Sequence, residues 1–320
     1  MSTPAVCMHK NSEALSRIVF VGGSPRSGTT LVQRVLNHHP KIYGGPEFDF
    51  IPSIAELYQR MRDSIRSGRI ASIVDEATVR QVFRELITSL LIPKAEAEGA
   101  AIFSEKTPSN VLVFGLLEEI APESKRILVI RDPRDVVNSM LEVGDRQRRR
   151  LGHTSGFVRD VFAAVKYMNR CLRAGCARAE RSANCLVVYY EDIVANPLEE
   201  ANRIYAFLGL EPLQELSLSD SDFESGAGKY LVDFRAAEGV GIDVVKSRVG
   251  VSKSRRSKAE LSYIVSHVVS HPLVKGRYQM ESDASAPRAY WCTVKTIGQR
   301  LKESLVRFPR SVRRWYPSLE

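Results

Sequence analysis

The chain has 320 residues, 44% of them hydrophobic, which is enough to bury a sizeable core and excludes a disordered protein. Its formal net charge of +9 favours an anionic ligand or partner, but it does not distinguish a nucleotide from a nucleic acid, an acidic peptide or a membrane surface. The N-terminal sequence MSTPAVCMHKNSEALSR has no apolar h-region, and no later run approaches the roughly 20 apolar residues of a membrane span. We therefore expect a cytoplasmic protein without a membrane span.

The first predicted elements are a strand, a turn and a helix. The strand RIVFVGG begins at Arg17, the turn reads SPRSG, and the helix TTLVQRVLNHH has apolar residues at helical spacing. The same spacing predicts helices over 54–65 and 76–91. AAIFSEK then predicts a short strand over 101–104, and Ser109 is expected to cap a further helix.

Two later strands have the composition of strands that are buried on both faces. RILVIRD at 126–132 is almost wholly apolar and leads directly into a helix through 136–143. Residues 185–190 repeat this arrangement, and a helix over 198–208 follows. Strands that alternate with helices form βαβ units, so we expect the α/β class: an open parallel β-sheet of the P-loop type with helices on both faces, plus extra helices.

The composition divides the chain into one large unit and two terminal segments. We expect a flexible N-terminus over 1–15, a single domain over 16–281 and a basic helical extension over 282–320. The extension begins with the loop sequence SDASAPRAY and continues with apolar residues on one side of a basic helix: Ile297, Leu301, Leu305 and Val306. We expect this helix to pack on the domain or on a partner.

The segment GSPRSGTT, residues 23–30, lies between the first strand and the first helix. In this position a glycine-rich loop can arrange backbone N–H groups around a phosphate at the positive end of the helix. A nucleoside-triphosphate P-loop has lysine at the position of Thr29, whereas this chain carries its cation at Arg26. The loop therefore suits an anion held by backbone donors, hydroxyls and a guanidinium, without a bridged metal ion.

With VGG before it, PRSGTTL resembles the 5'-phosphosulfate loop of sulfotransferases that use 3'-phosphoadenylyl sulfate (PAPS), especially the tyrosylprotein sulfotransferases. The resemblance extends over about 17–261. It implies that PAPS is the donor, that its product is PAP, and that no metal is required. The loop residues implied to bind the donor are Arg26, Ser27, Gly28, Thr29 and Thr30. The alternative is an ordinary tight turn between a strand and a helix.

Further along, the resemblance implies a grip on the 3'-phosphate of the donor. Arg131, at the end of a buried strand, and Ser139, on the next helix, correspond to the arginine and serine of that grip. Tyr190 is implied to lie near the adenine or its phosphate, and Lys253 to belong to a basic loop that closes over the 3'-phosphate. The alternatives are an Arg131 that only pairs with Asp132 or Asp135, and a Tyr190 that is a core residue.

Sulfuryl transfer needs a base for the acceptor hydroxyl and cations near the bridging oxygen of the donor. The resemblance implies that Glu47 is the general base and that Lys106 acts with Arg26 on the leaving group. Apolar neighbours in sequence, Tyr43, Phe48 and Phe50, are expected to shield the Glu47 carboxylate. The alternatives are a solvated loop glutamate and an ordinary surface lysine.

The acceptor is a hydroxyl compound that the sequence does not identify: a protein tyrosine, for instance in an acidic peptide, or a carbohydrate or other small hydroxyl. Asp49 stands where the tyrosylprotein branch has an arginine that helps to hold the acceptor peptide. This reversal of charge argues against a tyrosine acceptor. The arginine run Arg146 and 148–150 is either a solvated helix face or a lining that attracts an acidic acceptor. The sequence does not indicate an oligomeric state.

Two other functions are the alternatives to a sulfotransferase. An atypical P-loop kinase would need a lysine after Gly28 or elsewhere, and a metal-binding acid after a strand; the missing lysine and the 3'-phosphate motif both count against it. A non-enzymatic anion-binding module, binding nucleic acid or a membrane through the basic extension, leaves both nucleotide motifs unexplained. We therefore expect no nucleic-acid partner.

Histidine and cysteine residues are assigned structural roles. His38 and His39 directly follow the first helix, so capping or packing is favoured over a role as base. His267 and His271 are predicted to share a helical face, but without an HExxH pattern or a third ligand we expect no metal site. The five cysteines include no CxxC pair and are expected to be reduced thiols.

Overall fold

The computed structural model describes residues 12–154, 156–216, 249–252 and 257–279. The predicted helical extension over 282–320 and the predicted ligand Lys253 lie outside these ranges. The limits of the single domain predicted over 16–281 therefore stay a prediction.

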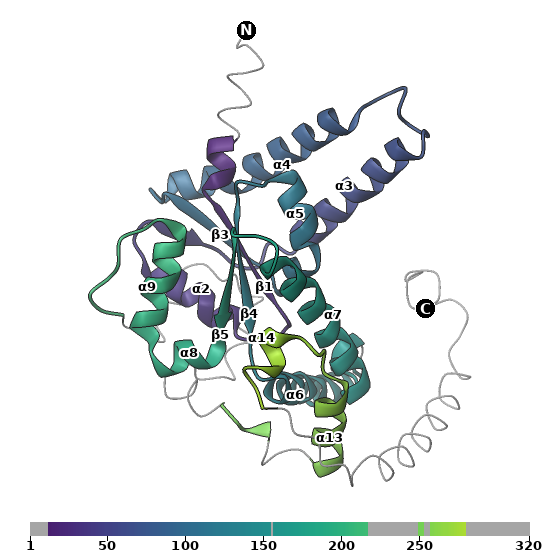
Figure 1. Ribbon diagram of the computed structural model, residues 1–320, viewed down its shortest axis with the longest axis vertical. Helices are drawn as coiled ribbons and strands as arrows, with labels where there is room; N and C mark the ends of the chain where they lie inside the picture. The colour runs from purple at the N-terminus through teal and green to yellow at the C-terminus, as the bar shows by residue number, and fades with distance from the viewer. Residues whose placement is uncertain (1–11, 155, 217–248, 253–256, 280–320) are drawn as a thin grey trace.

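Five parallel strands form one sheet in the described part of the chain, in the order β2-β3-β1-β4-β5 (Figure 1). Their bounds are β1 Ile18–Gly23, β2 Ile42–Gly44, β3 Ile102–Lys106, β4 Lys125–Ile130 and β5 Cys185–Tyr189. β1 is the central strand of the sheet, and all of its residues are buried, as its run of apolar residues predicts. The α/β class and the open parallel sheet are confirmed.

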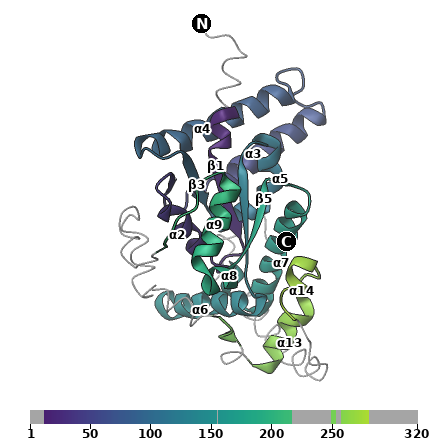
Figure 2. The same cartoon turned by 60° about the vertical axis from the view of Figure 1, so that its left-hand side comes forward.

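Alternate side chains of the strands build a separate hydrophobic core on each face of the sheet. Ile18 and Phe20 belong to the core that packs under α3 (Ile51–Arg66), α4 (Glu76–Ala97), α5 (Phe114–Ile120) and α7 (Val161–Ala179). Val19 and Val21 belong to the core on the other face, under α2 (Thr29–His38), α8 (Tyr190–Ala195) and α9 (Pro197–Leu208). Figure 2, turned by 60°, shows α9 in front of the strands.

The remaining helices lie at the carboxyl end of the sheet (Figure 1). α6 (Pro133–Leu151) follows β4 and packs against α7 and α13 (Lys258–His267), and α14 (Pro272–Lys275) follows α13. α6 begins well before the predicted Val136 because Asp132 caps it through the Arg134 N–H and Pro133 occupies its first turn. It ends at Leu151 and is capped by Gly152, whose φ of 74° is typical of a helix C-terminus. The arginine run therefore forms its last turns.

Two predicted features needed correction, and two elements were missed. Ser109 does not cap a helix: it lies inside the 3-10 helix Pro108–Val113, which precedes α5. α4 continues past the predicted end at residue 91 to Ala97, through Pro93, because Ile92 and Ala95 are buried in the core. The short strand β2 and the long helix α7 were not predicted. β2 has only three residues, and small and polar residues interrupt the apolar spacing of α7.

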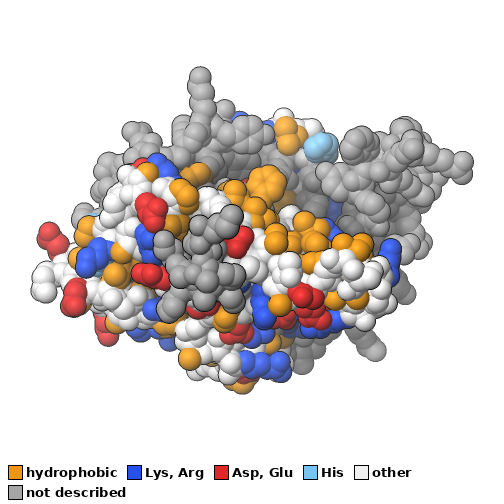
Figure 3. Space-filling view, turned by 90° about the horizontal axis from the view of Figure 1, so that it is seen from above, with side chains coloured by type: hydrophobic (Ala, Val, Ile, Leu, Met, Phe, Trp, Pro, Cys, Tyr) orange, Lys and Arg blue, Asp and Glu red, His pale blue; other side chains and the backbone are white. Residues whose placement is uncertain are grey.

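The helices α3 and α4 form a hairpin that projects from the amino end of the sheet (Figure 1). Seen from above, this end of the molecule has exposed apolar side chains interspersed with acidic and basic ones (Figure 3). The exposed apolar residues of the hairpin are Leu57, Ile73, Val82, Leu86 and Leu90. Among the helices of the described ranges, none has an apolar stretch long enough to cross a bilayer.

Candidate active site

The candidate site lies where β1, β3, β4 and β5 end. The parallel register aligns Val21 of β1 with Lys106 of β3 on one side and with Ile127 of β4 on the other. The loops that follow these strands therefore emerge from one edge of the sheet. This edge is the usual location of ligands in open α/β sheets.

The loop over residues 24–28 turns tightly before α2. The Ser27 N–H donates to the Ser24 carbonyl at 3.0 Å, and Arg26 and Gly28 adopt positive φ angles of 73° and 101°. The hydroxyls of Ser24 and Ser27 are buried, and neither has a hydrogen-bond partner among the described residues. Buried hydroxyls without partners beside a helix N-terminus fit an anionic ligand such as a phosphate.

Gly28 is required at its position for two reasons. Its φ of 101° is unfavourable for any residue with a Cβ atom. A Cβ atom at Gly28 would also lie 2.3 Å from Cδ2 of Tyr190. The ring of Tyr190 therefore packs directly on the loop, so the residue that was predicted to lie near the adenine contacts the predicted phosphate loop.

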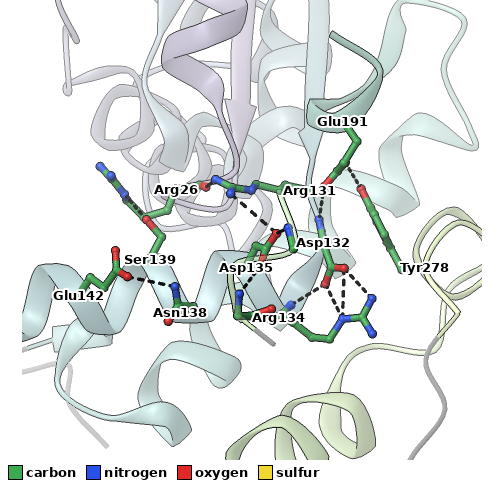
Figure 4. A network of polar contacts seen from close by, with 12 residues as sticks. Arg26, Arg131, Asp132, Arg134, Asp135, Asn138, Ser139, Glu142, Glu191 and Tyr278 are labelled. Carbon is green, nitrogen blue, oxygen red and sulfur yellow. Dashed lines mark hydrogen bonds and ion pairs between the residues drawn. The ribbon is translucent and has the colours of Figure 1, made fainter. Parts of the chain in front are cut away.

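Arg26 and Arg131 connect the two predicted nucleotide motifs (Figure 4). Nε of Arg26 donates to the Ser139 hydroxyl on α6 at 3.0 Å. Nη1 of Arg131 donates to the carbonyl oxygen of Arg26 at 3.4 Å. The guanidinium of Arg131 lies 4.2 Å above the centre of the Tyr190 ring, a cation–π contact. The structure thus brings together Arg26, Arg131, Ser139 and Tyr190.

The acidic neighbours of Arg131 have closer partners than Arg131. Asp132 forms a close ion pair with Arg134, with 2.6 Å between Oδ2 and Nη2. Nη2 of Arg131 lies 3.9 Å from Oδ2 of Asp135, at the outer limit of an ion pair. The alternative in which Arg131 serves only to pair with an adjacent aspartate is therefore weakened.

Asp135 is a buried residue that sequence reasoning did not assign to the site. Its carboxylate accepts hydrogen bonds from the N–H groups of Gly250 at 2.7 Å and Ser252 at 3.0 Å. These bonds fix residues 249–252 next to Arg131, directly before the predicted basic loop. The available signal was an acid in the first turn of a helix that follows a buried strand.

Glu191 and Tyr278 connect the same edge to the end of the described chain. One Glu191 oxygen accepts from the Asp132 N–H at 3.0 Å, and the other accepts from the Tyr278 hydroxyl at 2.7 Å (Figure 4). Burial, reinforced by the Glu191 charge, raises the pKa of Tyr278 above its ordinary range, so this hydroxyl stays protonated.

Glu47 and Lys106 meet in an ion pair between Oε1 and Nζ. Glu47 lies in the loop between β2 and α3 and is 30% exposed, while the Lys106 side chain at the end of β3 is only 3% exposed. Lys106 is therefore not a surface lysine. The predicted aromatic shield is only partial, because Phe50 is 64% exposed and Tyr43 packs against Phe103.

Asp49 adds a second carboxyl group near Glu47. Partial burial raises its pKa, the charge of Glu47 raises it further, and Lys106 opposes this effect. Asp49 also has a positive φ of 62°. Two carboxyl groups and one lysine thus lie at the side of the site formed by β2 and β3.

Other candidates from the sequence lie outside this cluster. His39 is buried against Tyr205, with 4.7 Å between ring centres, and accepts from the Lys41 N–H, so packing is its role. His267 and His271 do not share a helix, since His267 ends α13 and His271 caps α14. No group of three or more potential metal ligands occurs among the residues that the structure describes.

The cysteine side chains within the described ranges are free thiols, namely Cys171, Cys176 and Cys185. All are buried, and burial raises the pKa of Cys171 and Cys176 to about 12 and that of Cys185 to about 11. The expectation of reduced structural thiols is confirmed for these residues.

A family model and the curated relatives of the chain both indicate a sulfotransferase. The model of the sulfotransferase family matches residues 19–215. A putative protein-tyrosine sulfotransferase of Caenorhabditis briggsae is 30% identical over 69% of this chain and 79% of its own length. Protein-tyrosine sulfotransferase 2 of Gallus gallus is 32% identical over 60% of this chain. The chain spans only about half, 51%, of that second relative.

Solved structures that match the chain include a mouse sulfotransferase in complex with PAP. It has 15% sequence identity and a TM-score of 0.47, and the match covers 82% of this chain and 86% of the mouse chain. A sulfotransferase domain from the curacin biosynthetic pathway also has 15% identity and a TM-score of 0.47, over 88% of this chain and 97% of its own.

The relatives correct the expected location. The comparison with relatives named protein-tyrosine sulfotransferases contradicts a cytoplasmic location, so this prediction is wrong. The expectation depended on the absence of an apolar segment in the sequence, which does not determine a compartment.

Proposed function

Because the chain belongs to the sulfotransferase family, we propose that it transfers a sulfuryl group from PAPS to a hydroxyl acceptor. The observation that carries this proposal is the bond between Arg26 and Ser139, which joins the proposed 5'-phosphosulfate loop to the proposed 3'-phosphate grip. A nucleotide with phosphate groups at both its 5' and 3' positions suits two cation sites that adjoin one edge of a sheet.

The donor is held by the loop and by the ends of β4 and β5. Ser27, Thr29 and Thr30 donate hydroxyl groups to the 5'-phosphosulfate, and Gly28 lets the backbone approach it closely. Arg131 and Ser139 hold the 3'-phosphate. Tyr190 packs on both the loop and Arg131, which supports a place beside the adenosine part of PAPS. Lys253 closes the site in this proposal, and the sulfotransferase domain extends over 16–281. No metal ion takes part.

In the transfer, Glu47 takes the proton from the acceptor hydroxyl as the hydroxyl oxygen attacks sulfur. A new oxygen–sulfur bond forms while the bond from sulfur to the bridging oxygen of PAPS breaks, and PAP leaves with the bonding electrons. Lys106 and Arg26 stabilise the negative charge that develops on the bridging oxygen. The ion pair between Lys106 and Glu47 supports this assignment, because the two side chains lie on the same side of the site.

The acceptor is a protein tyrosine in this proposal. The relatives support it, since they are named protein-tyrosine sulfotransferases. Asp49 is the observation against it, because a second carboxylate beside Glu47 disfavours an acidic peptide. A carbohydrate or other small hydroxyl is the second candidate.

The test is transfer of labelled sulfate from PAPS to tyrosine peptides with acidic or neutral flanks, to glycans and to phenols. Glu47→Ala is expected to abolish transfer, whereas Glu56→Ala, which changes an exposed glutamate of α3, leaves it unchanged. Labelled tyrosine peptide that disappears with Glu47→Ala establishes the acceptor and the base. A protein that binds neither PAP nor PAPS would refute the donor.

A further inference from the structure

Glu105 is a buried acid next to the proposed site, and the mechanism above does not use it. It is the residue before Lys106 on β3, and it is 1% exposed. Burial raises its pKa, and hydrogen bonds from Thr107, Asn110 and the Phe48 N–H oppose that rise. A buried carboxyl group requires partners to offset the loss of water, so its contacts indicate its role.

The contacts of Glu105 lead to the loop that carries Glu47. Oε1 of Glu105 accepts from the Phe48 N–H at 3.3 Å and from the Thr107 hydroxyl at 2.7 Å. The Thr107 hydroxyl in turn accepts from the Asp49 N–H at 3.2 Å. Oε2 accepts from Asn110, which also donates to the Val21 carbonyl at the end of β1.

These bonds hold the two residues that directly follow Glu47. Residues 45–50 form no helix or strand, so no backbone ladder fixes their position. Asp49 also has a positive φ of 62°, a conformation that is unfavourable without support. The acceptors on Glu105 and Thr107 therefore supply the backbone support that a regular element would otherwise give.

Adjacent residues of a strand point to opposite faces, so Glu105 and Lys106 reach the loop by different routes. Lys106 contacts the Glu47 side chain, whereas Glu105 and Thr107 hold the backbone after it. Both routes start from the end of β3, which lies inside the sheet beside β1. A change in the Glu105–Thr107 pair would displace Glu47 without removing any group that touches the donor.

We propose that Glu105 and Thr107 are positioning residues that fix the backbone around Glu47 for proton transfer. This inference rests on the proposed function, because it assigns Glu47 the role of base. It goes beyond that function, because Glu105 and Thr107 contact neither PAPS nor the acceptor. Proton transfer needs the base within hydrogen-bond reach of the hydroxyl, so a loosened loop lowers the rate of the chemical step.

The test compares Thr107→Val, which removes the hydroxyl and keeps the shape, with Thr107→Ser, which keeps the hydroxyl. Thr88→Val is the matched control, because the Thr88 hydroxyl only donates to the Arg84 carbonyl within α4. The measurements are kcat and KM for sulfate transfer, PAP affinity by calorimetry, and hydrogen exchange of the Phe48 and Asp49 amides.

Thr107→Val is expected to lower kcat and to speed exchange of the Asp49 amide, each by about tenfold, which corresponds to loss of one buried hydrogen bond. PAP affinity should stay within about twofold of the wild type, because Thr107 does not contact PAPS in this proposal. Thr107→Ser should restore both kcat and slow exchange, and Thr88→Val should change neither.

Two results would overturn the inference. Unchanged kcat and exchange in Thr107→Val would show that the hydroxyl does not hold the loop. Parallel loss of PAP affinity and kcat would show a general structural role. A wild-type protein that binds PAP and transfers sulfate to no acceptor would instead count against the proposed function, and unchanged exchange in Thr107→Val would still decide against the anchoring role.

Discussion

Nε of Arg26 lies 3.0 Å from the Ser139 hydroxyl and donates to it, although the two residues are 113 positions apart in the chain. One belongs to the loop after β1 and the other to α6, which follows β4. Both strands are parallel neighbours in the sheet, so their following loops meet. The contact aligns the two halves of the proposed donor site with each other.

Arg131→Ala is expected to lower PAP affinity by about 10- to 100-fold, because a charge-assisted hydrogen bond contributes about 1.5–3 kcal/mol. Calorimetric titration with PAP measures the change. Arg150→Ala, which removes an exposed arginine of α6, serves as control and should leave the affinity unaltered. Equal affinities of Arg131→Ala and wild type would disprove the assignment of the 3'-phosphate grip.

Gly28→Ala is expected to destabilise the fold and to weaken PAP binding. The new Cβ atom would lie 2.3 Å from the Tyr190 ring, and the left-handed backbone adds about 1–2 kcal/mol of strain. Thermal unfolding and PAP titration of Gly28→Ala and of Gly28→Ala with Tyr190→Ala measure the two contributions. Tyr190→Ala alone completes the cycle, because it also removes a buried ring; the double variant should be destabilised by less than the sum of the two single variants, whereas strict additivity would place the whole cost of Gly28→Ala in the backbone.

Asp135→Ala is expected to release residues 249–252, since the N–H groups of Gly250 and Ser252 lose their acceptor. Loss of such a buried acceptor costs about 1–3 kcal/mol. Hydrogen exchange of the Ser252 amide should accelerate. The control is Asp145→Ala, an aspartate that pairs with Arg148 on the surface of the same helix. Unchanged exchange at Ser252 would contradict this anchoring.

Glu105→Gln should stabilise the protein relative to the wild type increasingly as pH rises above about 4.5, the ordinary pKa of the carboxyl group. Below that pH, Glu105 is protonated in both the folded and the unfolded state. As pH rises the unfolded state ionises first, because burial raises the pKa in the folded state, so wild-type stability falls while that of the glutamine variant does not.

Each unit by which that pKa is raised corresponds to about 1.4 kcal/mol. Thermal unfolding of both proteins from pH 4 to pH 7 measures the effect. The readout is the change of the stability difference with pH, since loss of the hydrogen bonds that Glu105 accepts shifts the difference by an amount that does not depend on pH. A pH-independent difference between the two proteins would refute a raised pKa.

Cys171, Cys176 and Cys185 are expected to resist alkylation at pH 8 in the folded protein. Their burial raises the pKa values to about 12, 12 and 11, and thiolate is the reactive form. Mass spectrometry after a short iodoacetamide pulse compares their peptides in native buffer and in guanidinium. Rapid labelling of these peptides in native buffer would contradict the buried positions.

The sequence by itself determined the class of fold and, through the family resemblance, the positions of the proposed nucleotide motifs. Uninterrupted apolar runs such as that of β4 occur because both faces of a parallel strand are covered, so they are recognised without a structure. The loop from Arg26 to Thr30 is equally local, because its function depends on consecutive backbone groups between a strand and a helix. These features follow from short-range pattern alone.

Only the tertiary structure decided which side chains meet across the sheet. The contacts of Asp135 with Gly250 and Ser252, and of Glu105 with Phe48, join residues distant in sequence, and no local period encodes such pairs. The buried Lys106 was assigned from resemblance, but its burial and its pairing with Glu47 depend on the position of β3 inside the sheet. Local sequence specifies the elements, whereas burial and long-range pairing arise only when they pack together.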